Sequence, residues 1–151
     1  MKHINGSTKT VCLIGNPVAH SFSPFIHNYG FELHNINSVY LAHLVEGDRL
    51  KEAIDGIRAL NYIGCNITYP YKTEAIRLLD EMSEDAKLIG AVNTIKNDNG
   101  KLIGYNTDGL GFVKGLKEKG FDLNNKSICI LGAGGAARSI IIALLKEYKC
   151  S

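Results

Sequence analysis

The chain has 151 residues, of which 45% are hydrophobic and 21% are charged, a balance that is typical of globular proteins and excludes a disordered chain. The 17 basic and 15 acidic residues give a formal net charge of +2, and no cluster of Lys and Arg indicates a nucleic-acid surface. No apolar run is long enough for a signal peptide or a membrane span, so we expect a cytoplasmic protein without membrane or nucleic-acid partners.

The first part of the chain alternates between strand and helix patterns. Apolar runs predict strands over residues 10–14, 39–45 and 62–68. Ser23 as an N-cap before Pro24 predicts a helix that ends near residue 34, and apolar residues at helical spacing predict a second helix from about 48 to 60. Two shorter helices are expected over 73–79 and 83–89.

The next pattern is a hairpin, because strand-like segments 91–96 and 101–105 flank Asp98-Asn99-Gly100. One antiparallel strand therefore joins an otherwise parallel pattern. Asp108 is a suitable cap for a helix that ends at Gly120. An apolar strand pattern over 127–131 then precedes a further helix pattern.

These elements predict an α/β protein. Residues 1–107 are expected to form a three-layer α/β/α substrate domain with a mostly parallel sheet that contains one antiparallel strand. A bridging helix and linker would occupy 108–126, and the first strand and helix of a truncated Rossmann-type domain would occupy 127–151. Because a βαβ unit needs about 30 residues or more, we expect the chain to be a fragment of a longer protein; the alternative is that its tail is disordered, swapped or packed unnaturally. Its apolar last helix would then be uncovered and would cause self-association.

A glycine-rich turn links that last strand pattern to its helix. It consists of Gly132, Ala133, Gly134, Gly135, Ala136 and Ala137. In a dinucleotide-binding turn the first glycine permits the bend, the second admits the pyrophosphate and the small last residue lets helix and strand approach. The residue that separates NAD from NADP is expected about 20 residues further on, past Ser151, so the turn indicates a dinucleotide without choosing between them. The alternative is an ordinary glycine-rich turn of an α/β protein.

Metal sites are not expected. The four cysteines form no C-x-x-C pair and the five histidines form no H-x-x-H set. Reduced structural thiols are therefore expected at Cys12, Cys65, Cys129 and Cys150.

Polar residues gather after the predicted strands. Ser21 and Ser23 follow the first strand, and in an extended loop their hydroxyls face one side, which suits a carboxylate; the alternative is that Ser23 only caps its helix. Lys72 follows the third strand, and Asp108 follows the hairpin. These two form either a plain salt bridge or a pair that moves a proton while a hydride passes between a secondary alcohol and a nicotinamide. Because a neighbouring carboxylate favours the ammonium form, Lys72 suits proton donation better than service as a base, unless the pair acts together.

Five segments in order together resemble the shikimate dehydrogenase family. They are Gly15-Asn-Pro17 with His20-Ser21-x-Ser23-Pro24 and His27-Asn28, Asn66-x-Thr68-x-Pro70-x-Lys72, Gly90-Ala-Val-Asn93-Thr94, Asn106-Thr107-Asp108-Gly109, and Gly132-Ala-Gly-Gly-Ala-Ala-Arg138. Tyr69 and Tyr71 depart from the smaller aliphatic residues or phenylalanine that are common there. The basic stretch that reads the 2′-phosphate in the family is absent from this sequence, as are its C-terminal helices.

The resemblance implies an NADP-dependent oxidoreductase that reversibly reduces 3-dehydroshikimate to shikimate in aromatic amino-acid and chorismate biosynthesis. Ser21 and Ser23 would bind the carboxylate. The ring hydroxyls would contact Asn66, Thr68, Asn93 and Asp108, and Lys72 with Asp108 would be the catalytic pair. The glycine-rich turn would hold the NADP pyrophosphate, weakly or not at all in this chain. The alternatives are a quinate or dual quinate/shikimate dehydrogenase, a non-catalytic module that binds polyhydroxy acids, and a purely structural Lys72–Asp108 pair.

Overall fold

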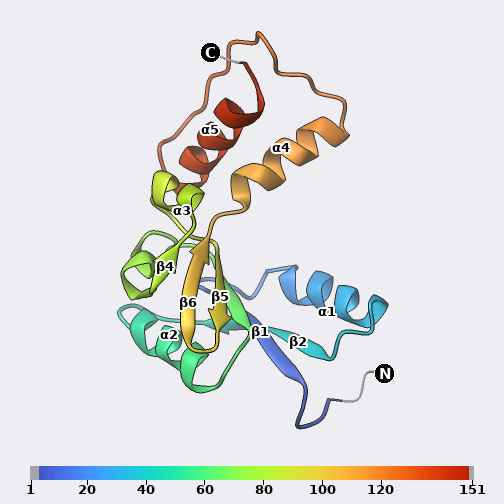
Figure 1. Ribbon diagram of the computed structural model, residues 1–151, viewed down its shortest axis with the longest axis vertical. Helices are drawn as coiled ribbons and strands as arrows, with labels where there is room; N and C mark the ends of the chain where they lie inside the picture. Colours follow the sequence, from blue (N-terminus) through green and yellow to red (C-terminus); the bar gives the residue numbers. More distant parts are fainter. Residues whose placement is uncertain (1–3, 150–151) are drawn as a thin grey trace.

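The computed structural model describes residues 4–149, so Cys150 lies outside the described residues. Its centre is a six-stranded sheet in the order β2-β1-β3-β5-β6-β4 (Figure 1). The strands are β1 (Lys9–Gly15), β2 (Ser38–Leu44), β3 (Gly64–Ile67), β4 (Glu81–Met82), β5 (Thr94–Asp98) and β6 (Lys101–Tyr105). The sequence did not predict the short β4, which pairs with β6.

The strand directions confirm the predicted sheet. β1 runs parallel to β2 and β3, and β4 runs parallel to β6, whereas β5 is antiparallel to both β3 and β6. The β5–β6 hairpin turns at Asn99 and Gly100, whose φ angles of 54° and 94° are both positive, as a type I′ turn requires.

Helices cover both faces of the sheet, which confirms the three layers. They are α1 (Ser23–Leu33), α2 (Leu50–Ala59), the 3-10 helix η1 (Glu74–Leu78) and α3 (Glu84–Ile89). Side chains alternate along β1, so that Cys12 and Ile14 enter the larger core with α2, η1 and α3. Leu13 points the other way and joins a smaller cluster with Tyr40 and with Phe31 of α1.

Two helices begin differently from the prediction. The N-cap of α1 is Phe22, so Ser23 is the first helical residue, and its N–H donates to Ser21 Oγ at 3.2 Å. In the same way, α4 (Asp108–Glu118) has Thr107 as its N-cap, and the Asp108 N–H donates to Asn106 Oδ1 at 3.1 Å. In both cases a polar side chain two residues earlier accepts the first helical amide proton, so neither Ser23 nor Asp108 acts as the cap.

At the C-terminal end, α4 and α5 (Gly135–Glu147) lie side by side beyond the carboxyl end of β6 (Figure 1). The strand predicted over 127–131 is not formed, and Leu131 is 94% exposed. A strand needs a hydrogen-bonded neighbour, and within residues 4–149 none pairs with this segment. Of the expected Rossmann-type start, the described chain contains the turn and the helix.

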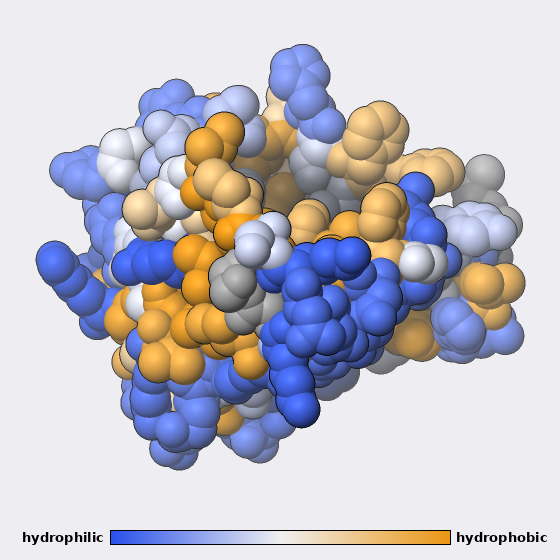
Figure 2. Space-filling view, turned by 90° about the horizontal axis from the view of Figure 1, so that it is seen from above, coloured by the Kyte–Doolittle hydropathy of each residue, from blue (hydrophilic) through white to orange (hydrophobic). Residues whose placement is uncertain are grey.

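Helix α5 is partly covered. Ser139 and Leu144 are buried on the side of α4, and Lys146 forms an ion pair with Asp85 of α3. Leu145, by contrast, is 61% exposed. Figure 2 views this end of the molecule and shows apolar side chains grouped on its surface. No helix in the described part of the chain is long and apolar enough to cross a membrane.

Candidate functional site

The candidate site lies at the topological switch point of the sheet, where the strands that follow β1 lie on opposite sides of it. β1 has β2 on one side and β3 on the other, and ligands of open α/β sheets bind at such a point, beside the carboxyl ends of the strands. The two loops that leave β1 and β3 are joined there, since the Asn16 N–H donates to Tyr69 O at 2.9 Å. Gly15 permits this approach, because a Cβ at that position would lie 2.3 Å from Thr68 Cγ2.

The predicted Lys72–Asp108 ion pair is formed in this region. Lys72 Nζ lies 2.6 Å from Asp108 Oδ2, and the two side chains are 25% and 29% exposed, so a ligand can reach both. Each residue is also fixed through its main chain. The Lys72 carbonyl accepts a hydrogen bond from Val92 N at 2.8 Å, and the Asp108 N–H is held by Asn106. The pair can therefore act as a salt bridge and can exchange a proton with a bound oxygen.

Asn93 supports Asp108 with its amide. Asn93 Nδ2 donates to Asp108 Oδ1 at 2.7 Å and to Thr107 Oγ1 at 2.9 Å, while Asn93 Oδ1 accepts from Thr107 N at 3.0 Å and from Thr94 Oγ1 at 2.9 Å. These bonds use both amide protons and both oxygen lone pairs. Contact between Asn93 and a ligand hydroxyl therefore requires the exchange of one of these bonds.

Asn66 is linked to the same network. Asn66 Nδ2 donates to Asn93 O at 3.2 Å and to Thr94 Oγ1 at 3.1 Å, and Asn66 Oδ1 accepts a hydrogen bond from the Tyr40 hydroxyl at 2.7 Å. Tyr40 on β2 thus reaches Asn66 on β3 across the intervening β1.

Tyr40 was not among the residues expected from the sequence. The available signal was a tyrosine inside an apolar strand run, because a buried tyrosine hydroxyl needs a hydrogen-bond partner. Burial raises the pKa of the Tyr40 hydroxyl well above its usual range, and the nearby Cys12 thiol adds to this effect. Tyr40 is therefore a neutral hydrogen-bonding group at physiological pH.

The two unusual tyrosines lie on opposite sides of the loop after β3. Tyr69 is 73% exposed, whereas Tyr71 is buried in the larger core, where its hydroxyl donates to Val45 O at 2.7 Å. Tyr71 therefore holds the loop that follows β2. Thr68 lies between β3 and these tyrosines, and its N–H donates to Ile14 O at 2.9 Å.

The glycine-rich turn lies next to the Lys72–Asp108 region. Gly132 has a φ of 117°, which favours glycine, and a Cβ at Gly132 or Gly134 would meet no described atom within 4 Å. Behind the turn, a Cβ at Gly135 would lie 3.1 Å from Ala91 Cβ, and Arg138 Nη2 donates to Gly90 O at 3.3 Å. The open backbone at the start of α5 fits phosphate groups, because helix N-terminal amides favour anions.

Among residues 4–149, no group of three or more His, Cys, Asp or Glu side chains could hold a metal ion. The three cysteines in this range, Cys12, Cys65 and Cys129, are free thiols.

Known proteins resemble the chain in both sequence and fold. Residues 13–95, more than half of the chain, match the family model of the shikimate dehydrogenase substrate binding domain. Shikimate dehydrogenase (NADP(+)) of Methanocaldococcus jannaschii is 51% identical over 144 residues, which cover 95% of this chain and 51% of the relative. That of Lactococcus lactis subsp. cremoris is 50% identical over 138 residues, which cover 91% of this chain and 48% of the relative.

Solved structures agree. A crystal structure of shikimate dehydrogenase in complex with NADP+ superimposes with a TM-score of 0.93 at 49% identity, covering 98% of this chain and 52% of that one. Shikimate 5-dehydrogenase from Listeria monocytogenes in complex with shikimate and NAD gives a TM-score of 0.88 at 44% identity, covering 96% and 50%. The chain thus spans about half the length of its relatives. It belongs to the shikimate dehydrogenase family, whose substrate-binding domain it contains.

Proposed function

We propose that the complete protein catalyses the NADP-dependent, reversible reduction of 3-dehydroshikimate to shikimate and that this chain supplies its substrate-binding part. The observation that carries the proposal is the accessible Lys72–Asp108 pair, with 2.6 Å between Nζ and Oδ2, inside a network of amides and hydroxyls. Relatives named shikimate dehydrogenase (NADP(+)), together with the family structures in complex with NADP+ and with shikimate, support this choice of reaction.

The residues of the site have distinct roles in this proposal. Ser21 and Ser23 bind the carboxylate at the start of α1. Thr68, which follows β3, and Asp108, at the start of α4, contact ring hydroxyls. The bonding of Asn66 leaves only a lone pair of its Oδ1 for a ligand, so it accepts a hydrogen bond from a ring hydroxyl. Asn93 can bind a hydroxyl by giving up its bond to Thr107, while it continues to hold Asp108.

The proton step belongs to Lys72. Bound NADPH supplies a hydride to the carbonyl carbon. Lys72 Nζ donates a proton to the carbonyl oxygen, so that the ketone becomes a secondary alcohol, and Asp108 stabilises and aligns the lysine. In the reverse direction the alcohol proton returns to Lys72. Asp108, held by Asn93 and by its own backbone bond to Asn106, fixes the direction from which Lys72 approaches.

We further propose a division of the chain into a substrate domain over residues 1–107, a bridging segment over 108–126 and the start of an NADP-binding domain over 127–151. The support for the last part is the open glycine-rich turn beside Gly90 and Ala91. Weak or absent NADP binding and little activity are expected of the 151-residue chain itself. We also propose that the chain self-associates through exposed apolar helix faces, including that of α5. The exposed side chain of Leu145 supports this proposal for α5.

The first test is a calorimetric titration of the 151-residue chain with shikimate and, separately, with quinate. We expect saturable binding of shikimate that Asp108→Ala removes. Tighter binding of quinate would favour the quinate dehydrogenase alternative, and a folded chain that binds neither acid would contradict the assignment of the substrate site to this chain.

Catalysis is tested in a chimera that joins this chain to the C-terminal half of the Methanocaldococcus jannaschii relative. Lys72→Ala should lower kcat by about 10²- to 10⁴-fold with KM for shikimate largely kept, since a positioned proton donor contributes on this order. Lys101→Ala is the matched control, because Lys101 also forms a 2.6 Å ion pair, with Glu81, away from the site. Equal kcat values in the parent and in Lys72→Ala would reduce the pair to a salt bridge.

A further inference from the structure

Tyr40 is held rigidly on the β2 strand. Only 1% of its surface is exposed, and its ring stacks on the His27 ring with 4.3 Å between centroids and 9° between planes. Asn28 fixes the Tyr40 main chain from α1. Its Nδ2 donates to Tyr40 O at 2.9 Å, and its Oδ1 accepts from Tyr40 N at 2.9 Å. The ring and the backbone of Tyr40 are thus both fixed by α1.

The hydroxyl of this fixed side chain contacts a residue assigned to the substrate. It donates to Asn66 Oδ1 at 2.7 Å, and Asn66 lies on β3, on the other side of β1 from β2. Tyr40 therefore links the proposed hydroxyl-binding end of the site to α1 through its fixed side chain.

The hydrogen bond from Tyr40 also determines which way the side-chain amide of Asn66 is oriented. An amide can rotate so that its oxygen and nitrogen exchange places, and only its partners decide which arrangement is kept. Here the Tyr40 hydroxyl donates to the oxygen, while Asn93 O and Thr94 Oγ1 take the two amide protons. Asn66 is left with one acceptor lone pair and no free donor.

We propose that Tyr40 is a positioning residue that locks Asn66 as a hydrogen-bond acceptor, so that the site selects a ligand with a hydroxyl donor facing Asn66. Tyr40 acts through Asn66 and does not itself contact the ligand. The inference rests on the proposed function for the identity of the ligand, whereas the Tyr40–Asn66 coupling is independent of it.

Tyr40→Phe tests the proposal, because it keeps the stacked ring and removes only the hydroxyl. Shikimate binding to the 151-residue chain should weaken about tenfold, the effect of one lost hydrogen bond in a buried network. In an Asn66→Ala background the same substitution should change affinity by a much smaller factor, since its main partner is already gone. The matched control is Tyr71→Phe, which removes another buried hydroxyl, bonded to Val45 O at 2.7 Å, and should leave affinity unchanged.

The outcomes separate the two proposals. Two results would overturn the positioning role and leave the proposed function standing. The first is that Tyr40→Phe binds shikimate with the same affinity as the wild type. The second is that Tyr40→Phe weakens shikimate binding by the same factor in the wild type and in Asn66→Ala. No shikimate binding by the folded wild type would count against the proposed function instead. The coupling is then decided without ligand by NMR: Tyr40→Phe should shift or merge the two Asn66 side-chain amide proton signals, and unshifted signals would refute the lock.

Discussion

Asn93 holds the side chain of Asp108 through its amide. Its amide donates to Asp108 Oδ1 at 2.7 Å and accepts from Thr107 N at 3.0 Å, with only 9% of the residue exposed. We predict that Asn93→Ala lowers the free energy of unfolding by about 1–3 kcal/mol, because buried groups lose their partners. In the chimera it should also lower kcat, since Asp108 no longer aligns Lys72.

Asn97 provides the control for this prediction. It is also 9% exposed, and its amide donates to Tyr62 O at 2.9 Å and accepts from Gly100 N at 2.8 Å, at the far end of β5 from the site. Asn97→Ala should destabilise to a similar degree in chemical denaturation and leave kcat unchanged. If both variants lose kcat equally, the effect of Asn93 is one of general stability and the positioning role is wrong.

At the residue scale, the sequence predicts which polar residues form the cluster but not which hydrogen bonds join them. The sequence predicts that Lys72 and Asp108, 36 residues apart in the chain, form a pair, and Lys72 Nζ lies 2.6 Å from Asp108 Oδ2. The sequence does not predict that all the hydrogen-bonding groups of the Asn93 side chain have partners, or that the Tyr40 hydroxyl bonds to Asn66. Both facts depend on which strands are neighbours in the sheet. Tyr40 on β2 reaches Asn66 on β3 across β1, and no local pattern encodes that contact.

At the element scale, the α4–α5 crossing determines where Asp108 lies. Gly109 follows Asp108, and a Cβ at Gly109 would lie 2.0 Å from the backbone oxygen of Ser139 on α5. Because a backbone atom cannot move aside cheaply, Gly109→Ala should force the helices apart and destabilise the chain by about 1–3 kcal/mol. We also expect weaker shikimate binding, since the displaced turn carries Asp108.

The neighbouring Gly111 makes this test specific. It lies in the same helix, and a Cβ there would meet nothing within 4 Å. Gly111→Ala should therefore stabilise the chain by up to about 1 kcal/mol through helix propensity. Thermal unfolding and calorimetry of the two variants give the comparison. A Gly109→Ala variant that is as stable as Gly111→Ala would show that the close crossing does not exist in solution.

The elements were predicted well where local signals and tertiary contacts agree. The hairpin at Asn99 and Gly100, the antiparallel β5 and the short helix α3 all follow from the sequence. The strand predicted over 127–131 is absent because apolar character alone does not supply a hydrogen-bonded neighbour. The two-residue β4 has too little length to produce a pattern.

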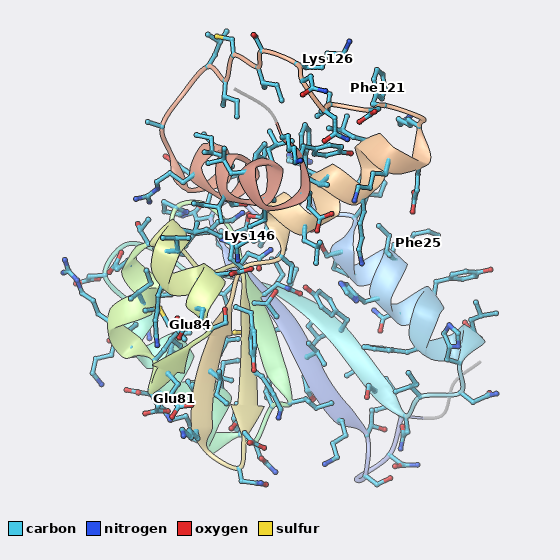
Figure 3. The ribbon with its side chains drawn as sticks, turned by 45° about the horizontal axis from the view of Figure 1, so that its top comes forward. Phe25, Glu81, Glu84, Phe121, Lys126 and Lys146 are labelled. Carbon is cyan, nitrogen blue, oxygen red and sulfur yellow. The ribbon has the colours of Figure 1, made fainter. Side chains whose placement is uncertain are left out.

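At the scale of the whole molecule, apolar surface is distributed differently from the sequence expectation. The sequence placed the uncovered face on the last helix, yet α4 and α3 cover part of α5, and α1 exposes more. No residue of α1 is fully buried. The α1 stripe, at helical spacing from its N-cap onward, consists of residues that are each more than 60% exposed: Phe22, Phe25, Ile26, Tyr29 and Leu33. Figure 3 shows Phe25 on α1, the helix beside the edge strand β2.

This stripe leads to the last prediction, which concerns association. Contiguous exposed apolar surface of this kind favours contact with another apolar surface, so the 151-residue chain should self-associate as its concentration rises. Phe25→Glu should shift sedimentation toward the monomer more than Leu145→Glu does, because Phe25 lies inside the α1 stripe, whereas Leu145 is the most exposed large apolar residue of α5. A larger effect of Leu145→Glu would assign association to α5, and a monomer at every concentration would contradict both. Unchanged shikimate affinity in Phe25→Glu would show that association and the substrate site are separate properties of this fold.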